Sequence, residues 1–357
     1  MRSDNFTKDE YLNGRGAQIN TANKYLANSL SKEHVEGIDD WEIGNEKTSF
    51  IFSSAKTIVN KVESPDVGMV YSLNPYQGCE HGCIYCYARN SHEYWGFSAG
   101  LDFERKILVK KDAPELFKKF LEKKNWPAHT ISISGNTDCY QPCERKYRLT
   151  RQLLKIALDY KQPISMITKN SLILRDLDII QEMAKHNLIG VFVSITSLDE
   201  NLRQKLEPRT TTAKQRLKVI EQLSSVGVPM GVMSAPIIPG LNNHEIPAIL
   251  KASAQAGAIW AGYNIVRLNG SIGKIFEDWL AKSFPDRFEK VWHQIQSCHN
   301  GNVNDSRFGK RMRGEGNFAE LINHTFKLHC KLNGLNQKSI ELDSSSFKKP
   351  QAQLKLF

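Results

Sequence analysis

The chain has 357 residues, of which 40% are hydrophobic and 24% charged, an ordinary balance for a globular protein with a sizeable core. Its net charge of +10 favours polyanionic partners such as nucleic acid without requiring them. Seven cysteines, with three of them in one short stretch, exclude a disulfide framework, and no window approaches 18 uninterrupted apolar residues, so we expect a protein of the reducing cytoplasm with no membrane span.

Residues 1–62 predict an N-terminal arm that is partly extended. Residues 1–47 are polar, mixed in charge and without a sustained period, which is typical of a segment that wraps a domain or stays mobile. The stretch TSFIFSSAKTIVNKV (48–62) has enough β-branched and aromatic side chains for a strand or a short helix. Its pattern does not decide between the two.

Residues 63–270 predict the main domain, in which short apolar runs alternate with helical periods. Six strands are expected at residues 70–73, 129–135, 163–168, 190–196, 228–236 and 258–268. Helices are expected at residues 144–160, 177–188, 213–223 and 243–256. Apolar strands separated by helices indicate a parallel sheet with both faces covered.

Six such units fit an α/β fold, a partial (β/α)6 barrel of the TIM type. An open doubly wound sheet has the same local pattern and stays possible at this point. The barrel is favoured because polar residues with useful chemistry recur just after the strand ends, which is where barrel sites collect.

Residues 271–340 predict a helical extension that contains a basic loop. Helices are expected near residues 273–283, 286–298 and 319–331. The loop between the last two, NDSRFGKRMRGEGNF (304–318), combines cations with glycines, a composition that suits phosphate groups. Further basic residues could extend the same surface, namely Arg89, Arg105, Lys106, Lys110 and Lys111.

Three cysteines, Cys79, Cys83 and Cys86, follow the first predicted barrel strand in a C-x3-C-x2-C spacing. Thiolates this close together favour zinc or an iron–sulfur centre. Structural zinc normally has four ligands, and no second cysteine pair follows at the distance of a zinc finger. An iron–sulfur cluster also normally takes four cysteines, so three leave one coordination position open.

This motif, with Tyr85 just before the third cysteine, resembles the signature of the radical S-adenosylmethionine (SAM) superfamily. The chain is similar in particular to the branch related to spore photoproduct lyase, a group of DNA-repair proteins. The stretches that carry the resemblance are NPYQGCEHGCIYCYAR (74–89), SGNTDCYQP (134–142), LEPRTTT (206–212) and APIIPGLNNHE (235–245). The likeness runs from about Ser64 to about Leu335.

The resemblance implies a [4Fe-4S] cluster held by the three cysteines, with SAM bound to the iron that they leave open. Reductive cleavage of SAM would yield a 5'-deoxyadenosyl radical, which removes a hydrogen atom from the substrate. The resemblance also implies that Tyr85 lies near the adenine, and that a flavodoxin- or ferredoxin-type protein supplies the electron.

SAM carries an ammonium, a carboxylate and ribose hydroxyls, so its site needs polar groups of both signs. Asp138, after the second strand, could accept hydrogen bonds from the amino group. Lys169 and Arg209 could bind the carboxylate, because their cations suit it and Arg can do so with two parallel bonds. Ser194 and Glu207 could hold the ribose hydroxyls. Proteins of the resembling branch have similar residues at the motif positions of Asp138, Lys169 and Ser194.

Cys139 and Cys143 form a second C-x3-C pair, with only two local ligands for a metal. The resemblance suggests Cys139 as a thiol that donates hydrogen to a product radical. The family's donor cysteine, however, falls closer to the position of Gly135. Structural roles for both thiols stay open.

Residues 341–357 predict a flexible tail. Its end, QLKLF (Gln353 to Phe357), resembles the short peptide that docks bacterial repair proteins to the sliding clamp. We therefore expect a radical SAM enzyme that acts on a DNA lesion or another nucleic acid. The alternatives are modification of a peptide or small molecule, or a non-catalytic iron–sulfur or zinc protein that binds DNA.

Overall fold

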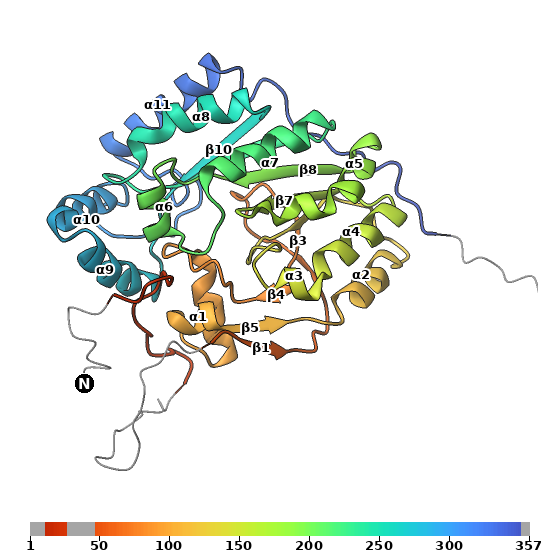
Figure 1. The fold of residues 1–357 in the computed structure, drawn as a ribbon, viewed down its shortest axis with the longest axis horizontal. Coiled ribbons are helices and arrows are strands. Elements are labelled where there is room, and N and C mark those ends of the chain that lie inside the picture. Colours follow the sequence, from red (N-terminus) through yellow and green to blue (C-terminus); the bar gives the residue numbers. More distant parts are fainter. Residues whose placement is uncertain (1–10, 27–46, 351–357) are drawn as a thin grey trace, which may run out of the picture.

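A central sheet of seven strands organises the fold, which the computed structural model describes for residues 11–26 and 47–350. Its strands are β2 (Val59–Lys61), β3 (Tyr71–Leu73), β6 (Ile131–Ile133), β7 (Ile164–Thr168), β8 (Ile189–Ser194), β9 (Met230–Ile237) and β10 (Trp260–Ile265). They lie side by side in the order β10-β9-β8-β7-β6-β3-β2 (Figure 1). All neighbours run parallel except β2, which is antiparallel to β3.

This strand order confirms the partial barrel and decides against the doubly wound sheet. The parallel strands follow one another in space as they do along the chain, from β3 to β10. A doubly wound sheet needs a point at which the order reverses, and crossovers are almost always right-handed. Crossovers that all advance in one direction therefore place their helices on one face of the sheet. The carboxyl ends of the six parallel strands together form the mouth of the barrel.

The helices that cover the outside of the sheet are α4 (Leu149–Asp159), α5 (Leu177–Lys185), α7 (Ala213–Ser225), α8 (Ile246–Gln255) and α11 (Asn317–Leu332). Short elements precede four of the helices or lie between them in the chain, namely α3 (Glu144–Tyr147), η2 (Ser171–Asp176), α6 (Glu200–Leu206) and η3 (Asn243–Glu245). Side-chain caps fix three of the starts, and at η2 Asn170 accepts a hydrogen bond from Leu172 N. Thr212 accepts a hydrogen bond from Gln215 N at α7, and Asp199 accepts one from Asn201 N at α6.

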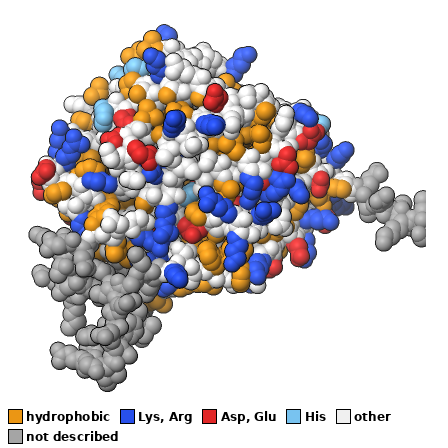
Figure 2. Space-filling view, in the orientation of Figure 1, with side chains coloured by type: hydrophobic (Ala, Val, Ile, Leu, Met, Phe, Trp, Pro, Cys, Tyr) orange, Lys and Arg blue, Asp and Glu red, His pale blue; other side chains and the backbone are white. Residues whose placement is uncertain are grey.

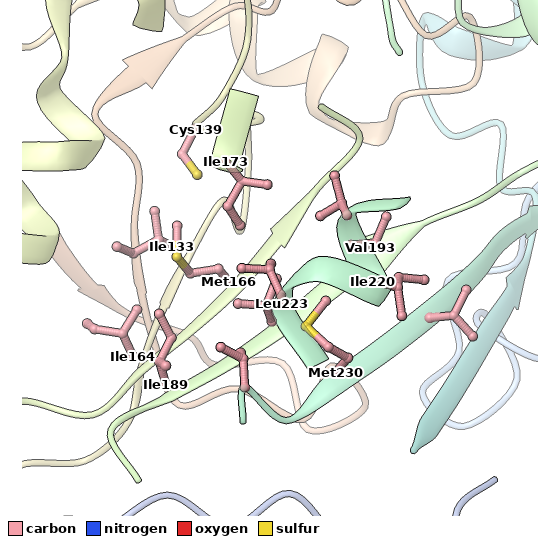
Figure 3. Close-up of a cluster of buried hydrophobic side chains, with 14 of the residues drawn as sticks. Ile133, Cys139, Ile164, Met166, Ile173, Ile189, Val193, Ile220, Leu223 and Met230 are labelled. Atoms are coloured by element: carbon pink, nitrogen blue, oxygen red, sulfur yellow. The ribbon is translucent and has the colours of Figure 1, made fainter. Parts of the chain in front are cut away.

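The main core fills the layer between sheet and helices (Figure 3). Along β7, Ile164 and Met166 are fully buried, whereas Ser165 and Ile167 on the opposite face are only partly covered. The buried face meets residues such as Leu223 of α7 in the same cluster. Each fully buried aliphatic side chain of this kind contributes roughly 1.5–3 kcal/mol of transfer free energy.

A second, smaller sheet was not expected from the sequence. It has the order β1-β5-β4 and consists of β1 (Ser49–Phe52), β4 (Tyr76–Gln77) and β5 (Lys106–Val109). The stretch 48–62, for which the sequence allowed a strand or a helix, forms strands β1 and β2. Between the cysteine motif and β6 the chain adds η1 (Tyr87–Trp95), α1 (Leu101–Arg105) and α2 (Ala113–Leu121).

The C-terminal extension contains α9 (Ile272–Ser283), η4 (Pro285–Arg287) and α10 (Phe288–Ser297) before α11. After α11, the Asn336 side chain pairs with both backbone polar groups of Ala261, at 2.7 and 3.0 Å, and so covers part of the exposed edge of β10. Residues 341–350 then run along the amino ends of the strands, where Lys348 N donates to Tyr160 O. The predicted clamp peptide, Gln353 to Phe357, lies outside the described residues.

Candidate functional site: a cysteine loop at the mouth of the barrel

The loop that carries the three cysteines leaves the carboxyl end of β3 and is anchored by tight glycine contacts. Gly78 and Gly82 have φ angles of 77° and 68°, a region that favours glycine. A Cβ atom on Gly82 would lie 2.8 Å from a carboxylate oxygen of Glu104. The loop therefore needs glycine at this position for both backbone conformation and space.

The thiols of Cys79, Cys83 and Cys86 are free, and the first two are buried. Burial raises the pKa of all three, and for Cys79 the nearby Asp138 and the other two thiols raise it further. Across residues 11–26 and 47–350, no set of three or more His, Cys, Asp or Glu side chains is arranged to hold a single metal ion. Three soft donors in one loop nevertheless fit the ligand set of an iron–sulfur cluster, whose four irons require more widely spaced thiolates than one ion does.

A buried ion pair lies beneath the loop. Arg89 and Glu104 are both fully buried, and their side chains meet at 2.6 Å. Arg89 also donates to the carbonyl oxygens of Gly82, at 3.2 Å, and Cys83, at 3.0 Å. This position corrects the proposal that Arg89 belongs to a phosphate-binding surface, because its guanidinium has no access to solvent.

The N-terminal segment packs directly onto the cysteine loop. The backbone amides of Gly16 and Ala17 donate to the Glu104 carboxylate at 3.2 and 2.8 Å. A Cβ atom on Gly16 would lie only 1.7 Å from the Gly82 carbonyl oxygen, so the two backbones touch here. The predicted arm therefore contributes to the site through residues 14–18, which we call the N-terminal strap.

Asp138 lies at the mouth, where it links the cysteine loop to the end of β7. Its carboxylate accepts from Thr168 Oγ1 and Lys169 N, each at 2.8 Å, and lies 3.3 Å from His81 Nδ1. Burial alone would raise the pKa of Asp138, but His81 and the donated backbone amides hold it below its usual value. His81, inside the cysteine motif, also contacts Asn170 Nδ2 at 3.1 Å. Sequence reasoning missed His81, although its place between Cys79 and Cys83 was a signal.

Glu207 is the centre of a second buried network. It accepts from Thr196 Oγ1 at 2.6 Å, from the Tyr85 hydroxyl and from Arg216, and Lys169 Nζ lies 4.0 Å away. Burial would raise the pKa of Glu207, yet Arg216 and Lys169 lower it to about 2. The carboxylate is thus engaged within the protein, and its predicted contact with the ribose stays a prediction.

The remaining predicted SAM contacts lie at the same edge of the sheet. Lys169 Nζ stands 5.9 Å from the centre of the Tyr85 ring. Ser194, the last residue of β8, accepts from Arg216 through its carbonyl oxygen at 2.9 Å. Arg209 turns toward the N-terminal strap, where its Nε donates to Gly14 O at 3.1 Å, and its backbone N donates to His81 O. Folding therefore brings these residues together around the cysteine loop, while their individual roles toward SAM stay predictions.

Cys139 and Cys143 belong to separate hydrophobic clusters. Cys139 is fully buried in the main core, which also holds Ile173 (Figure 3), and burial raises the pKa of its thiol well above the usual value. Cys143 packs in the cluster of the smaller sheet, and its backbone N donates to Glu80 at 2.6 Å. The hydrogen-donor role of Cys139 stays a prediction, and its burial speaks for a structural thiol.

The cations of the basic loop are largely paired within the protein. Arg311 binds Asp66, Arg307 binds Asp305 and Glu315, and Arg313 stacks over the Tyr263 ring at 4.1 Å. On the face of the molecule drawn in Figure 2, basic side chains are mixed with acidic and apolar ones. The loop is thus less available to phosphate groups than its composition predicts.

A cavity of about 660 Å³ lies away from the cysteine loop, between the edge of β10 and α11. It is lined by Tyr263, Arg313, Asn323 and Lys327, among others. None of the residues that carry the cysteine chemistry contributes to it. We therefore place the candidate active site at the mouth of the barrel rather than in this cavity. Among the described residues, no helix has the length and apolar character needed to cross a membrane.

Comparison with solved structures supports the fold. Spore photoproduct lyase complexed with dinucleoside spore photoproduct superposes with a TM-score of 0.60 at 15% identity, covering 85% of this chain and 86% of that one. A variant of that lyase with bound S-adenosylmethionine and the same dinucleoside gives the same TM-score and identity, over 85% and 86% of the two chains. At this identity the likeness concerns the fold alone.

Sequence comparison supports the family. An uncharacterized protein of Mycobacterium tuberculosis is 33% identical over 65% of this chain and 69% of its own length. An uncharacterized protein of Methanocaldococcus jannaschii is 28% identical over 69% of this chain and 88% of its own length. The model of the radical SAM superfamily matches residues 73–252, about half of the chain, from the end of β3 to α8. The chain therefore belongs to the radical SAM superfamily.

Proposed function

We propose that this radical SAM enzyme binds its [4Fe-4S] cluster through Cys79, Cys83 and Cys86 and acts on a nucleic-acid substrate, such as a DNA lesion. The observation that carries the first part is the loop of three free thiols at the mouth of the barrel, with no fourth cysteine in the motif. When bound, the cluster and SAM supply the electron and the carbon-centred 5'-deoxyadenosyl radical.

The chain's own residues hold and shield this site. Arg89 fixes the carbonyl groups of the cysteine loop, and the N-terminal strap covers it. Asp138 presents an anionic carboxylate beside the loop, which suits the ammonium of SAM. Lys169 supplies a cation near Tyr85, which suits the SAM carboxylate. Each of these groups is positioned before a ligand arrives, which reduces the ordering cost of binding.

Anaerobic reconstitution tests the cluster and the cleavage of SAM. Protein treated with iron, sulfide, dithionite and SAM should release 5'-deoxyadenosine, and Cys83→Ala should abolish it. Cys298→Ala is the matched control, because Cys298 is a buried thiol outside the motif and should leave the product unchanged. Iron-free, colourless protein, or zinc-loaded protein indifferent to SAM, would refute the proposal.

The nucleic-acid substrate rests on the net charge of +10 and on the similarity to the fold of a lyase solved with a dinucleoside lesion. Fluorescence anisotropy with a labelled oligonucleotide should show binding that weakens steeply with salt, since phosphate contacts release counterions. Absence of binding at low salt would favour the peptide or small-molecule alternative. A flavodoxin- or ferredoxin-type donor and a clamp contact through Gln353 to Phe357 belong to the same proposal.

A further inference from the structure

A loop closes the open side of the partial barrel. Because β2 and β10 are the two edges of the sheet, the barrel has a seam between them. Residues 303–316, the seam loop, lie along β10: Ile265 N donates to Met312 O at 2.9 Å, and Leu268 N donates to Val303 O at 3.1 Å. From this loop, Arg311 reaches Asp66 in the connection between β2 and β3. The residues that follow β10, which include Arg267 and Leu268, thus lie between the seam loop and the mouth of the barrel.

Arg267, in this segment, differs from the arginines of the seam loop. Among the described residues its buried Nε has no hydrogen-bond partner, and its Nη1 contacts the Met312 sulfur at 3.7 Å. Within residues 11–26 and 47–350 no carboxylate lies at ion-pair distance from it, whereas Arg307 and Arg311 both have acidic partners. A thioether is a weak acceptor, and an unsatisfied buried donor costs about 1–3 kcal/mol, or more when charged.

The electrostatic surroundings of Arg267 favour an anion. Burial lowers its pKa most, and the neighbouring Arg311 lowers it further. The charges of Asp66 and Asp305 oppose this shift, but both carboxylates are already bound to Arg311 and Arg307. The site therefore holds excess positive charge in a partly dry environment, where a ligand anion gains more than it does in water.

Two asparagines near Arg267 also have a side-chain oxygen without a hydrogen-bond partner among the described residues. The Oδ1 atoms of Asn269 and Asn304 are buried and unpaired among the described residues. The Leu268–Val303 hydrogen bond brings the two segments that carry them together. The backbone carbonyl oxygen of Asn269 accepts a hydrogen bond from the side chain of Asn90 in η1, the helix that starts right after Cys86. The unpaired groups are therefore next to the elements that form the mouth.

We propose that Arg267, flanked by Asn269 and Asn304, binds a phosphodiester of the substrate, while the two amides bind polar groups of its sugar or base. The inference rests on the proposed function and narrows it to a substrate with phosphate at the β10 side of the mouth. A guanidinium fork matches the paired oxygens of a phosphate, and side-chain amides serve both donors and acceptors of a nucleotide. The net charge of +10 favours a polyanion over a neutral peptide.

Equilibrium binding of the dinucleotide TpT, with thymidine as the ligand that lacks phosphate, tests this proposal. TpT should bind the reconstituted wild-type protein, and Arg267→Gln should weaken it at least tenfold while leaving the weak binding of thymidine unchanged. Arg287→Gln, at an exposed arginine of η4, is the control and should leave the affinity for TpT unchanged. Equal affinity of Arg267→Gln and wild type, or no TpT binding by wild type, would overturn the proposal.

A measurement on the wild-type protein tests the same site even if the Arg267→Gln variant misfolds. The Nε–H resonance of Arg267, assigned by its loss in Arg267→Lys, should move with TpT and stay in place with thymidine. Movement with an acidic dipeptide of equal charge, and not with TpT, would assign the site to a carboxylate and overturn the phosphate proposal. Formation of 5'-deoxyadenosine without substrate, measured in the same samples, reports separately on the proposed function.

Discussion

Glu104→Gln should strongly destabilise the cysteine loop, because it removes one partner of a fully buried ion pair. In the native protein Glu104 meets Arg89 at 2.6 Å and accepts the amides of Gly16 and Ala17 on its two oxygens. Glutamine keeps the shape, but it leaves the Arg89 charge uncompensated and offers one acceptor oxygen in place of two. Breaking a buried pair in this way costs about 3–5 kcal/mol.

Equilibrium urea unfolding of the protein without cluster measures this loss. The control is Glu182→Gln. The side chains of Glu182 and Lys185 are 44% and 62% exposed, and such surface ion pairs contribute about 0.5 kcal/mol or less to the free energy of unfolding. The double variant Arg89→Met/Glu104→Met should recover part of the loss, since no buried charge is left unpaired. A loss for Glu104→Gln as small as that of the control would refute the view that a buried charge pair organises the loop.

The structure also predicts the effects of three other substitutions. The pKa of Glu207 is about 2 in the fold against a usual 4.5, so its carboxylate stabilises the protein above pH 4.5 and this contribution is lost as the pH falls toward 2. The difference in unfolding free energy between wild type and Glu207→Gln should accordingly shrink by on the order of 3 kcal/mol over that range in urea titrations, and a difference independent of pH would contradict it. Gly16→Ala should lift the N-terminal strap, because its Cβ would lie 1.7 Å from the Gly82 carbonyl oxygen, and the visible absorbance of the cluster should fade faster in air. An unchanged rate would show that the strap does not shield the cluster. Asp66→Asn should release Arg311 and speed tryptic cleavage within the seam loop. Equal cleavage rates in the variant and the wild type would show that the Asp66–Arg311 ion pair does not restrain the loop.

The positions of the barrel strands along the chain could be predicted from sequence because each strand is a short apolar run followed by a helical period. The predicted strand at 163–168 corresponds to β7 (Ile164–Thr168), and the predicted helix at 213–223 lies within α7 (Ala213–Ser225). Strand β5 (Lys106–Val109) was missed because its four residues follow helix α1 without a break. Its partners β1 and β4 lie on either side of it in the sheet but both come earlier in the chain, a pairing that no local period can reveal.

In the candidate site, too, the features set by local sequence could be predicted and those set by contacts in space could not. Cys79, Cys83 and Cys86 could be predicted because all three lie in one loop with a recognisable spacing. Arg89 and Arg216 could not, since a basic residue in a sequence most often predicts an exposed side chain. Their burial depends on partners brought to them by folding, Glu104 for the first and Glu207 for the second. Sequence reasoning therefore located the cysteine loop and missed the buried charges around it.

These buried cations also act on the chemistry of the thiols. Burial is the main reason that the pKa values of Cys83 and Cys86 are raised, so both keep their protons at neutral pH while no metal is bound. Lys169 opposes that shift at both thiols, Arg216 opposes it at Cys83, and Arg89 opposes it at Cys86. Metal binding by thiols releases protons and leaves negative charge in a buried place. Arg89 and Lys169 thus supply positive potential that favours the thiolate form of Cys86, whereas at Cys83 the negative charge of Glu207 outweighs the opposing effect of its partner Arg216.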